Sequence, residues 1–320
     1  MGKFLDSIKV AERSARRKQA GTLRDLQIEP RTRARYVKAM ECFFDWTDRQ
    51  DYDQPFSITN IDDTFGDYLE HCWDSGVARG LASDALSAVQ HFLPNLRGQL
   101  KASWRLLKAW DSNEVPARAP PLLVEQVQAM AGVALGWGRW DAAAALLTAF
   151  NGFLRPGELR FLTKDCIFDH AKQVVVLNLG LTKGGKRAGA PEQIGIDDEF
   201  AYLLLKRQLY SQPAGTPLLP RGLIEFRALF KQLVNELGFD SSYIKPYSLR
   251  RGGATHHFRV LGNLSATTER GRWRAKKTAQ IYITEGVALV VDAKMTRAQK
   301  AQLRRGRELL LRHLLALTRH

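Results

Sequence analysis

Two arginines of this 320-residue chain stand at expected helix ends rather than in the middle of a solvated face. Arg155 belongs to Phe153-Leu-Arg-Pro-Gly-Glu-Leu159, where the Pro-Gly pair must break an apolar helix. Arg250 belongs to Pro246-Tyr-Ser-Leu-Arg-Arg-Gly-Gly-Ala-Thr255, which is expected to open another helix, where the dipole disfavours a spare positive charge unless negative charge lies nearby. Because the guanidinium fork of arginine donates paired hydrogen bonds to phosphate, both positions are candidates for binding a phosphate group.

A tryptophan and a tyrosine follow these arginines within one short segment. They lie in Arg270-Gly-Arg-Trp273 and in Thr278-Ala-Gln-Ile-Tyr-Ile283. Taken singly, an arginine is usually a surface residue, and a tryptophan or a tyrosine at helical spacing usually packs in a core. The order and the spacing of the clusters together favour a shared site.

Several enzyme classes lack their motifs in this sequence. Gly184-Gly-Lys-Arg187 has no upstream glycine at the spacing of a P-loop, and neither GxSxG nor HExxH occurs. The acidic groups Asp62-Asp63 and Asp197-Asp-Glu199 look like helix starts, so a two-metal nuclease is poorly supported. The adjacent His256 and His257 point in different directions on a helix, which suits packing or solvent better than shared metal ligation.

These three clusters, together with the turn that carries Lys183, resemble the ordered boxes of the tyrosine recombinase, or phage integrase, superfamily of DNA strand-exchange enzymes. Leu154-Arg-Pro-Gly-Glu-Leu159 resembles the family's first arginine box, and Ser248-Leu-Arg250 resembles the second. Lys183 lies on the strand turn where the family keeps its lysine, and Trp273 stands nine residues before Tyr282, as the family's His or Trp precedes the nucleophilic tyrosine. The resemblance covers the chain from about Leu122 onward. It implies a catalytic set of Arg155, Lys183, Tyr247, Arg250, Trp273 and Tyr282, with Glu158 in support.

The resemblance also implies a mechanism that needs no metal and no other cofactor. Tyr282 would attack the scissile phosphate to form a 3′-phosphotyrosyl enzyme, and the freed 5′-hydroxyl would later rejoin the strand. Arg155 and Arg250 would stabilise charge on the phosphorane oxygens, and Lys183 would protonate the leaving 5′-oxygen. Trp273 would donate its indole N–H to a phosphate oxygen.

Two positions depart from the family pattern. Tyr247 stands where the family usually has histidine, and Arg272 stands where many members have glycine. A tyrosine can donate a hydrogen bond to phosphate, but its pKa near 10 makes it a poor proton carrier at neutral pH. Three alternatives therefore stay open: a DNA-binding protein derived from a recombinase but without catalysis, DNA relaxation of the type IB topoisomerase kind, and a helical adaptor with a basic surface.

The charge of the whole chain agrees with a nucleic-acid partner. The net charge is +15, the isoelectric point is about 9.9, and the apolar fraction of 45% argues against a disordered basic tail. The cysteines are scattered and the N-terminus has no apolar signal core, so we expect a soluble intracellular protein, in a bacterial cytoplasm or nucleoid or in a eukaryotic nucleus. Double-stranded DNA is the predicted partner, with predicted contacts from Arg31, Arg33, Arg35, Lys38, Lys186, Arg187 and Arg251.

The pattern of apolar residues predicts a mainly α fold with a small antiparallel β-sheet. Residues 1–30 form a basic arm, for which two interpretations stay open: a solvated, disordered segment or an extension that binds phosphate. Residues 31–115 are predicted to form a helical DNA-binding domain in which Ser83 caps a helix. Prolines mark a linker at 116–121, and residues 122–320 form the catalytic domain. In that domain we expect strands at Val174–Leu179 and Glu192–Ile196, followed by a helix with its N-cap at Asp197–Glu199.

The C-terminal stretch from Thr296 to His320 carries a helical stripe formed by Leu303, Leu310, Leu314 and Leu317. The simple explanation is packing against its own domain. In the family a terminal helix docks on a neighbouring subunit, so the resemblance implies a homo-tetramer on DNA assembled through this helix.

Overall fold

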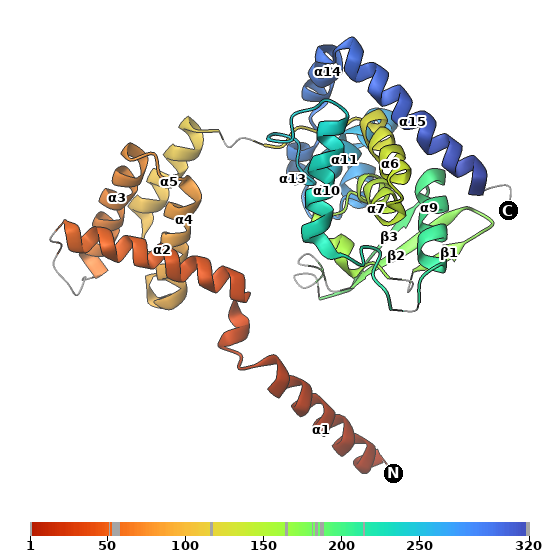
Figure 1. The fold of residues 1–320 in the computed structure, drawn as a ribbon. Coiled ribbons are helices and arrows are strands. Elements are labelled where there is room, and N and C mark those ends of the chain that lie inside the picture. Colours follow the sequence, from red (N-terminus) through yellow and green to blue (C-terminus); the bar gives the residue numbers. More distant parts are fainter. Residues whose placement is uncertain are drawn as a thin grey trace. The chain divides into compact units, whose positions relative to one another are not determined.

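The computed structural model describes residues 2–50, 52, 58–115, 118–163, 166–180, 182, 185, 189–213 and 215–317. The chain divides into two compact units, Met1–Ala117 and Arg118–His320. Within the described residues the structure is mainly helical, with one three-stranded antiparallel sheet in the second unit (Figure 1), which confirms the predicted fold class. No helix of the described part is long and apolar enough to cross a membrane.

The first unit consists of helices. Its elements are α1 (Gly2–Ala20), η1 (Asp25–Gln27), α2 (Pro30–Arg49), α3 (Ile58–Asp74), α4 (Arg79–Phe92), η2 (Pro94–Leu96) and α5 (Lys101–Asn113). The core of the bundle is aromatic: the ring of Phe43 stacks on that of Phe65 at a centroid distance of 4.1 Å, and the edge of Tyr68 meets Phe43 at 5.2 Å. Leu86 and Leu107 close this core from α4 and α5.

Three local predictions in this unit are wrong. Ser83 does not cap α4, because the helix begins one turn earlier at Arg79 and buries Ala82 in its first turns. Asp62 does not begin a helix, because it lies within α3. Its carboxylate instead caps the start of α5 by accepting hydrogen bonds from the backbone N–H groups of residues 102 and 103.

The third correction concerns the N-terminal arm. Residues Gly2–Ala20 form a helix rather than a disordered segment. The run from Ala11 to Ala20 holds good helix formers and neither glycine nor proline, so local propensity favours helix even though the described side chains of this arm are exposed.

The second unit surrounds a large apolar core. Its elements are α6 (Val124–Gly136), α7 (Trp140–Asn151), η3 (Pro156–Phe161), β1 (Ile167–Asp169), β2 (Val174–Gly180), β3 (Glu192–Ile196), α9 (Glu199–Tyr210), α10 (Gly222–Glu236), α11 (Tyr247–Leu261), α12 (Leu264–Arg270), α13 (Lys276–Tyr282), α14 (Glu285–Lys294) and α15 (Arg297–Leu317). Every residue of α7 from Asp141 to Phe150 is buried, so this helix forms the centre of the unit.

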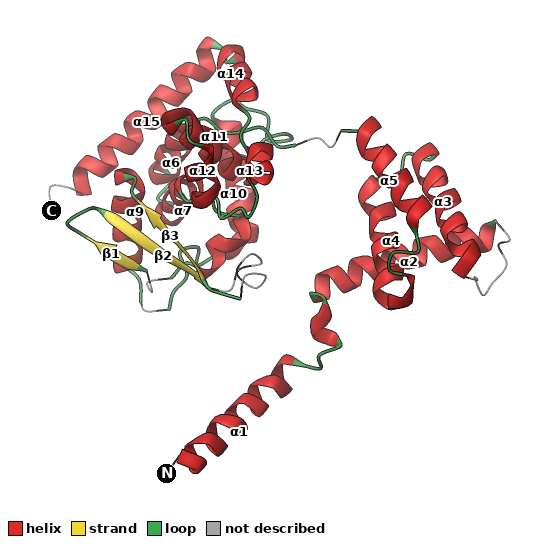
Figure 2. Cartoon of the chain, turned by 180° about the vertical axis from the view of Figure 1, so that it is seen from behind, coloured by secondary structure: helices red, strands yellow, loops and turns green. Residues whose placement is uncertain are grey.

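The sheet has the order β1-β2-β3 and contacts α9 (Figure 2). Val175 pairs with Ile196 and Leu177 with Ile194, and these side chains face the core on alternate positions. Both predicted strands are confirmed, whereas the three-residue β1 is too short to show a periodic pattern. The predicted helix start is also confirmed, since the Asp198 carboxylate accepts from the Ala201 N–H at 2.8 Å.

The C-terminal helix packs inside its own unit. Helix α15 runs along α6 (Figure 1), and a Cβ added to Gly132 would lie 1.8 Å from the Gly306 carbonyl oxygen. This close approach lets Leu303, Leu310 and Leu314 enter the core. The leucine stripe therefore packs against its own domain, which is the simple explanation of the pattern, and assembly of subunits through this helix stays a prediction.

Candidate active site

The first arginine box forms a tight turn after α7. Phe153 takes a positive φ of 45°, and Arg155 is the N-cap of η3. Glu158 stabilises this turn with two hydrogen bonds. Its Oε2 accepts from the Arg155 backbone N–H at 2.8 Å, and its Oε1 accepts from Arg155 Nη1 at 2.7 Å. The acidic residue of the box therefore fixes both the backbone and the guanidinium of Arg155.

Glu158 is itself buried and holds a second arginine. Its Oε2 lies 2.9 Å from Nη2 of Arg272. Burial alone would raise the pKa of Glu158, but the charge of Arg272 and the bonds from Arg155 outweigh it and leave the pKa lowered. Burial would likewise lower the pKa of Arg155, and the Glu158 carboxylate reverses this, so the pKa is raised. Glu158 and Arg155 are therefore both charged at neutral pH.

The second arginine box places Arg250 at the centre of the site. A Cβ on Gly253 would lie 1.9 Å from the Phe150 carbonyl oxygen, so the glycine lets α11 approach α7 closely. Arg250 is 0% exposed; its guanidinium donates to the Phe153 carbonyl oxygen and, at 2.8 Å, to that of Gly271. Burial and the nearby charges of other arginines lower the pKa of Arg250 to about 10, which still leaves it protonated at neutral pH.

Both aromatic residues of the third cluster meet Arg250. The Arg250 Cζ lies 4.8 Å from the ring centroid of Trp273 and 5.3 Å from that of Tyr282, and the two rings are 4.7 Å apart. The Tyr282 hydroxyl forms a hydrogen bond with the Tyr247 hydroxyl. Burial and this hydrogen bond raise the pKa of Tyr247 to about 12, so Tyr247 is neutral at physiological pH.

Buried N–H groups without a hydrogen-bond partner gather in this cluster. Among the described residues they include Nε of Arg250, Nε of Arg272 and Nε1 of Trp273. Such groups are uncommon in folded proteins and are costly unless a partner satisfies them. Unpaired donors beside three guanidinium groups suit an anionic ligand such as a phosphate.

Sequence reasoning missed two members of this arrangement. Glu192, at the start of β3, accepts from the Thr182 hydroxyl at 2.6 Å and lies 3.5 Å from Nη1 of Arg272. In the sequence Arg272 stands out only as a departure from the family's glycine, and its φ of 55° shows that this position does have the left-handed backbone that favours glycine.

The remaining predicted residues lie elsewhere or are not described. Lys183, Lys186 and Arg187 lie outside the described residues. Arg251 is only 6% exposed, and burial lowers its pKa, so the structure places it inside the unit rather than on a surface. Its contact with DNA stays a prediction.

The predicted DNA contacts of α2 belong to the first unit. Arg31, Arg35 and Lys38 are exposed and share one helix face, at intervals of four and three residues. Arg33 lies on a different face of α2, where its Nη2 is 3.7 Å from Oδ1 of Asp25. Arg35 donates from Nε to Asp84 at 2.9 Å, so one carboxylate already offsets part of the charge on this face.

No metal site competes with the arginine cluster in the described part of the chain, where no three His, Cys, Asp or Glu side chains converge. His257 bonds through Nδ1 to the Thr267 hydroxyl at 2.9 Å, and His256 packs near the Phe150 ring, so both histidines have the packing role predicted for them.

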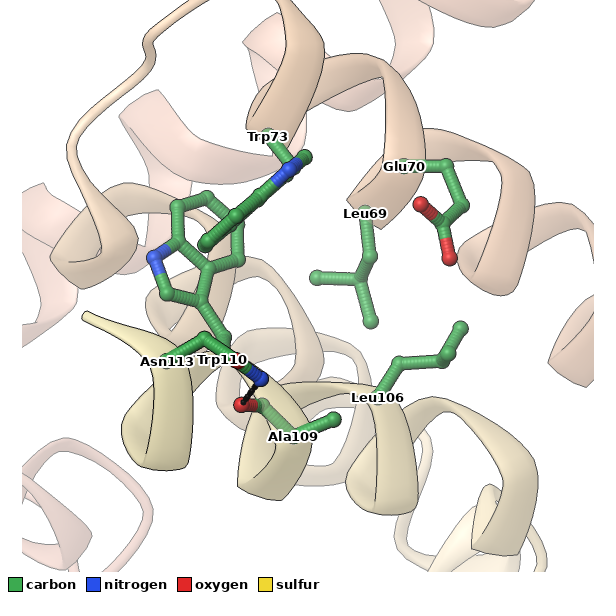
Figure 3. Close-up of a pocket in the computed structure, with 7 residues that line it drawn as sticks. All are labelled: Leu69, Glu70, Trp73, Leu106, Ala109, Trp110 and Asn113. Atoms are coloured by element: carbon green, nitrogen blue, oxygen red, sulfur yellow. Dashed lines mark hydrogen bonds between the residues drawn. The ribbon is translucent and has the colours of Figure 1, made fainter.

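An apolar pocket lies in the first unit between α3 and α5 (Figure 3). Trp73 meets Trp110 edge to face at 5.2 Å, and Leu69 and Leu106 line the same hollow. The residues that line it include none of the predicted site residues, so it is separate from the arginine cluster.

Comparison with solved structures identifies the fold. The chain resembles the Tn1549 transposon integrase in complex with transposon right-end DNA (TM-score 0.59, 14% identity, 88% of this chain and 97% of the other). It also resembles the XerH site-specific recombinase bound to its difH substrate (0.57, 13%, 81% and 78%) and a lambda integrase dimer bound to a core site (0.56, 13%, 85% and 76%). No protein-family model and no curated protein sequence matches the chain. The chain therefore has the fold of the tyrosine recombinases.

Proposed function

We propose that this protein is a site-specific DNA recombinase of the tyrosine type, which cleaves and rejoins double-stranded DNA through a covalent 3′-phosphotyrosyl intermediate on Tyr282. The observation that carries the proposal is the convergence of the Tyr282 hydroxyl, the buried Arg250 and the unpaired Trp273 indole N–H in one cluster. The likeness in fold to recombinases and integrases solved with DNA supports it.

In the proposed reaction the arginines bind and orient the scissile phosphate. Arg250 and Arg155 donate to its non-bridging oxygens, and the Trp273 N–H adds a further donor, so negative charge that develops on the phosphorane is stabilised by groups already in place. The Tyr282 oxygen attacks phosphorus, the bond to the 5′-oxygen breaks, and Lys183 supplies the proton to that leaving oxygen.

Tyr247 has a different task from the histidine that it replaces. With a pKa of about 12 its hydroxyl is neutral and does not accept the Tyr282 proton to any useful extent at neutral pH. Its hydrogen bond to the Tyr282 hydroxyl instead orients the nucleophile. Proton removal from Tyr282 then falls to water or to the phosphate itself.

The proposal extends to binding and assembly. The helical first unit binds duplex DNA through the exposed cations of α2, and four copies assemble at a pair of sites. Because α15 buries its leucine stripe in its own unit, the exposed apolar side chains of α14, Val287, Leu289 and Val290, are the surface to test for subunit contacts.

A suicide substrate tests the proposal. Genomic DNA fragments with nicks near the cleavage position trap a covalent adduct, because the short strand that carries the 5′-hydroxyl diffuses away. We expect an adduct that survives denaturation with the wild-type protein and with Tyr247→Phe, and no adduct with Tyr282→Phe. DNA binding with no adduct on any substrate would favour the non-catalytic alternative.

A further inference from the structure

Strained backbone marks the arginine cluster. Among the described residues, three that are not glycine have a positive φ: Phe153, Gln173 and Arg272. Gln173 lies in the turn between β1 and β2, whereas Phe153 and Arg272 both belong to the cluster. A positive φ is energetically unfavourable for a residue that carries a Cβ, so contacts in the surrounding structure must offset this cost.

The side chain of Arg272 accounts for that offset. It is only 10% exposed and lies between two carboxylates, 2.9 Å from Oε2 of Glu158 and 3.5 Å from Oε2 of Glu192. Its Nη2 also lies 3.5 Å from the Phe153 carbonyl oxygen. Because this buried guanidinium group contacts two carboxylates and one carbonyl oxygen, it restrains the positions of all three groups.

Each of these contacts leads to a different part of the site. Glu158 holds Arg155, and the Phe153 carbonyl oxygen also accepts from Arg250. Glu192 accepts from Thr182, the residue directly before Lys183 in the sequence. Arg272 is therefore linked, through one intermediate group each, to both arginines of the cluster and to the segment that carries the lysine.

We propose that Arg272 is a positioning residue for DNA cleavage, which holds the two phosphate-binding arginines in register through Glu158 and the Phe153 carbonyl group. This inference rests on the proposed function. Arg272 also contributes to the charge of the cluster. Among the described residues three guanidinium groups stand against two carboxylates, so removal of Arg272 lowers the net positive charge that this part of the site offers to a phosphate.

The variants Arg272→Gly and Arg272→Lys separate side-chain function from backbone strain. Glycine suits the positive φ, so Arg272→Gly removes the guanidinium while it relieves the strained conformation, and the unit is expected to fold. Lysine keeps the charge but cannot bridge two carboxylates in the same plane. Arg270→Gln is the matched control, since Arg270 pairs with Asp197 at 2.7 Å in the same segment and touches neither Glu158 nor Glu192.

The experiment measures the single-turnover rate of adduct formation at saturating suicide substrate, with a phosphate or a neutral methylphosphonate at the scissile position, together with thermal melting. We expect Arg272→Gly to lower the rate on phosphate by about 100-fold, as expected for misplaced binding groups, and Arg272→Lys to fall between it and wild type. On methylphosphonate, which carries less charge for the arginines to stabilise, the deficit of Arg272→Gly should shrink to a few-fold. Arg270→Gln should cleave like wild type on both substrates.

Two results would overturn the inference while leaving the proposed function intact: a wild-type rate for Arg272→Gly, or an equal deficit on both substrates that follows a lowered melting temperature. No adduct from the wild-type protein would overturn the proposed function, and this inference with it.

Discussion

The positively charged side chains of this protein occur in two contrasting settings. On α2, Arg31, Arg35 and Lys38 stand on an exposed helix face, and the Arg35 side chain is 57% exposed. In the second unit Arg250 has no exposed surface and is held by two carbonyl oxygens and two aromatic rings. The first setting suits attraction of a polyanion at many positions, and the second suits one phosphate at one position.

The difference shows what burial adds to a positive charge. A solvated cation is screened by water and salt and loses side-chain freedom when it binds. Arg250 has already lost both its water and its side-chain freedom on folding, so under the proposed function it would not have to be desolvated and ordered again when it stabilises charge on the phosphate. The folded structure offsets the cost of burying this charge through the carbonyl groups of Phe153 and Gly271 and through the nearby Glu158 carboxylate.

The largest effect is expected from Arg250. Arg250→Ala should lower the single-turnover rate of adduct formation by about 10³-fold, because it removes a buried donor from the phosphate site. Arg250→Lys should recover a part of this rate, since it keeps the charge without the fork. Rates are measured at saturating DNA, with thermal melting to show that each variant is folded; a rate near wild type for Arg250→Ala would contradict the assigned role.

The close packing that positions Arg250 can be tested separately. Gly253→Ala places a Cβ against the Phe150 carbonyl oxygen, so we expect the free energy of unfolding of this unit to fall by about 3 kcal/mol in a urea titration. Gly286→Ala, on α14 with open space around it, is the control and should change stability little or raise it slightly. Equal stability of both variants would show that α11 has room to move away from α7.

A smaller effect is expected from the carboxylate that holds Arg155. Glu158→Gln keeps the shape of the side chain and removes its charge, so the cleavage rate should fall about tenfold, or about 1.4 kcal/mol. The pKa of Glu158 is lowered in the folded protein, so its contribution to stability is complete above the ordinary glutamate value of about 4.5 and is lost as the pH falls through the lowered folded value. Acid unfolding of Glu158→Gln should lack this component; identical acid titrations of the two proteins would contradict it.

The smallest effect belongs to the exposed face. Arg31→Ala should weaken DNA binding modestly and reduce the slope of log affinity against log salt by about 0.9, as expected for one phosphate contact. Arg35→Ala should change the slope less, because Asp84 already offsets its charge. Neither variant should change the cleavage rate at saturating DNA, and a loss of cleavage there would remove the distinction between the two settings.

Much of this fold follows from local sequence patterns. The β-branched run at Val174 and the Asp198 cap identify their elements, because strand alternation and helix capping depend on neighbours in the chain. The predictions for the start of α4 and for Asp62 are wrong, because burial of the first turn decides where α4 begins and a contact with a residue 40 positions away decides the role of Asp62. The destination of the α15 leucine stripe depends on Gly132 and Gly306, whose pairing no local pattern reveals.

The candidate site was predictable to a similar extent. The order of the boxes drew attention to Arg155, Arg250, Trp273 and Tyr282, and the structure brings these side chains into one cluster. The contacts of Arg272 with Glu158 and Glu192 join residues that are 114 and 80 positions apart in the sequence. Such contacts arise only when the chain is folded. In the sequence, the arginine at a position where many family members have glycine is the only indication of them.

The central claim is that Tyr282 is the nucleophile, and its contact with the Tyr247 hydroxyl makes the choice between the two tyrosines a direct test. Wild-type protein trapped on a suicide substrate is digested with protease and nuclease, and the peptide that carries the residual nucleotide is sequenced by mass spectrometry. The account predicts a single modified residue, Tyr282, joined to a 3′-phosphate. A nucleotide on Tyr247, or DNA cleavage with no modified tyrosine, would contradict it.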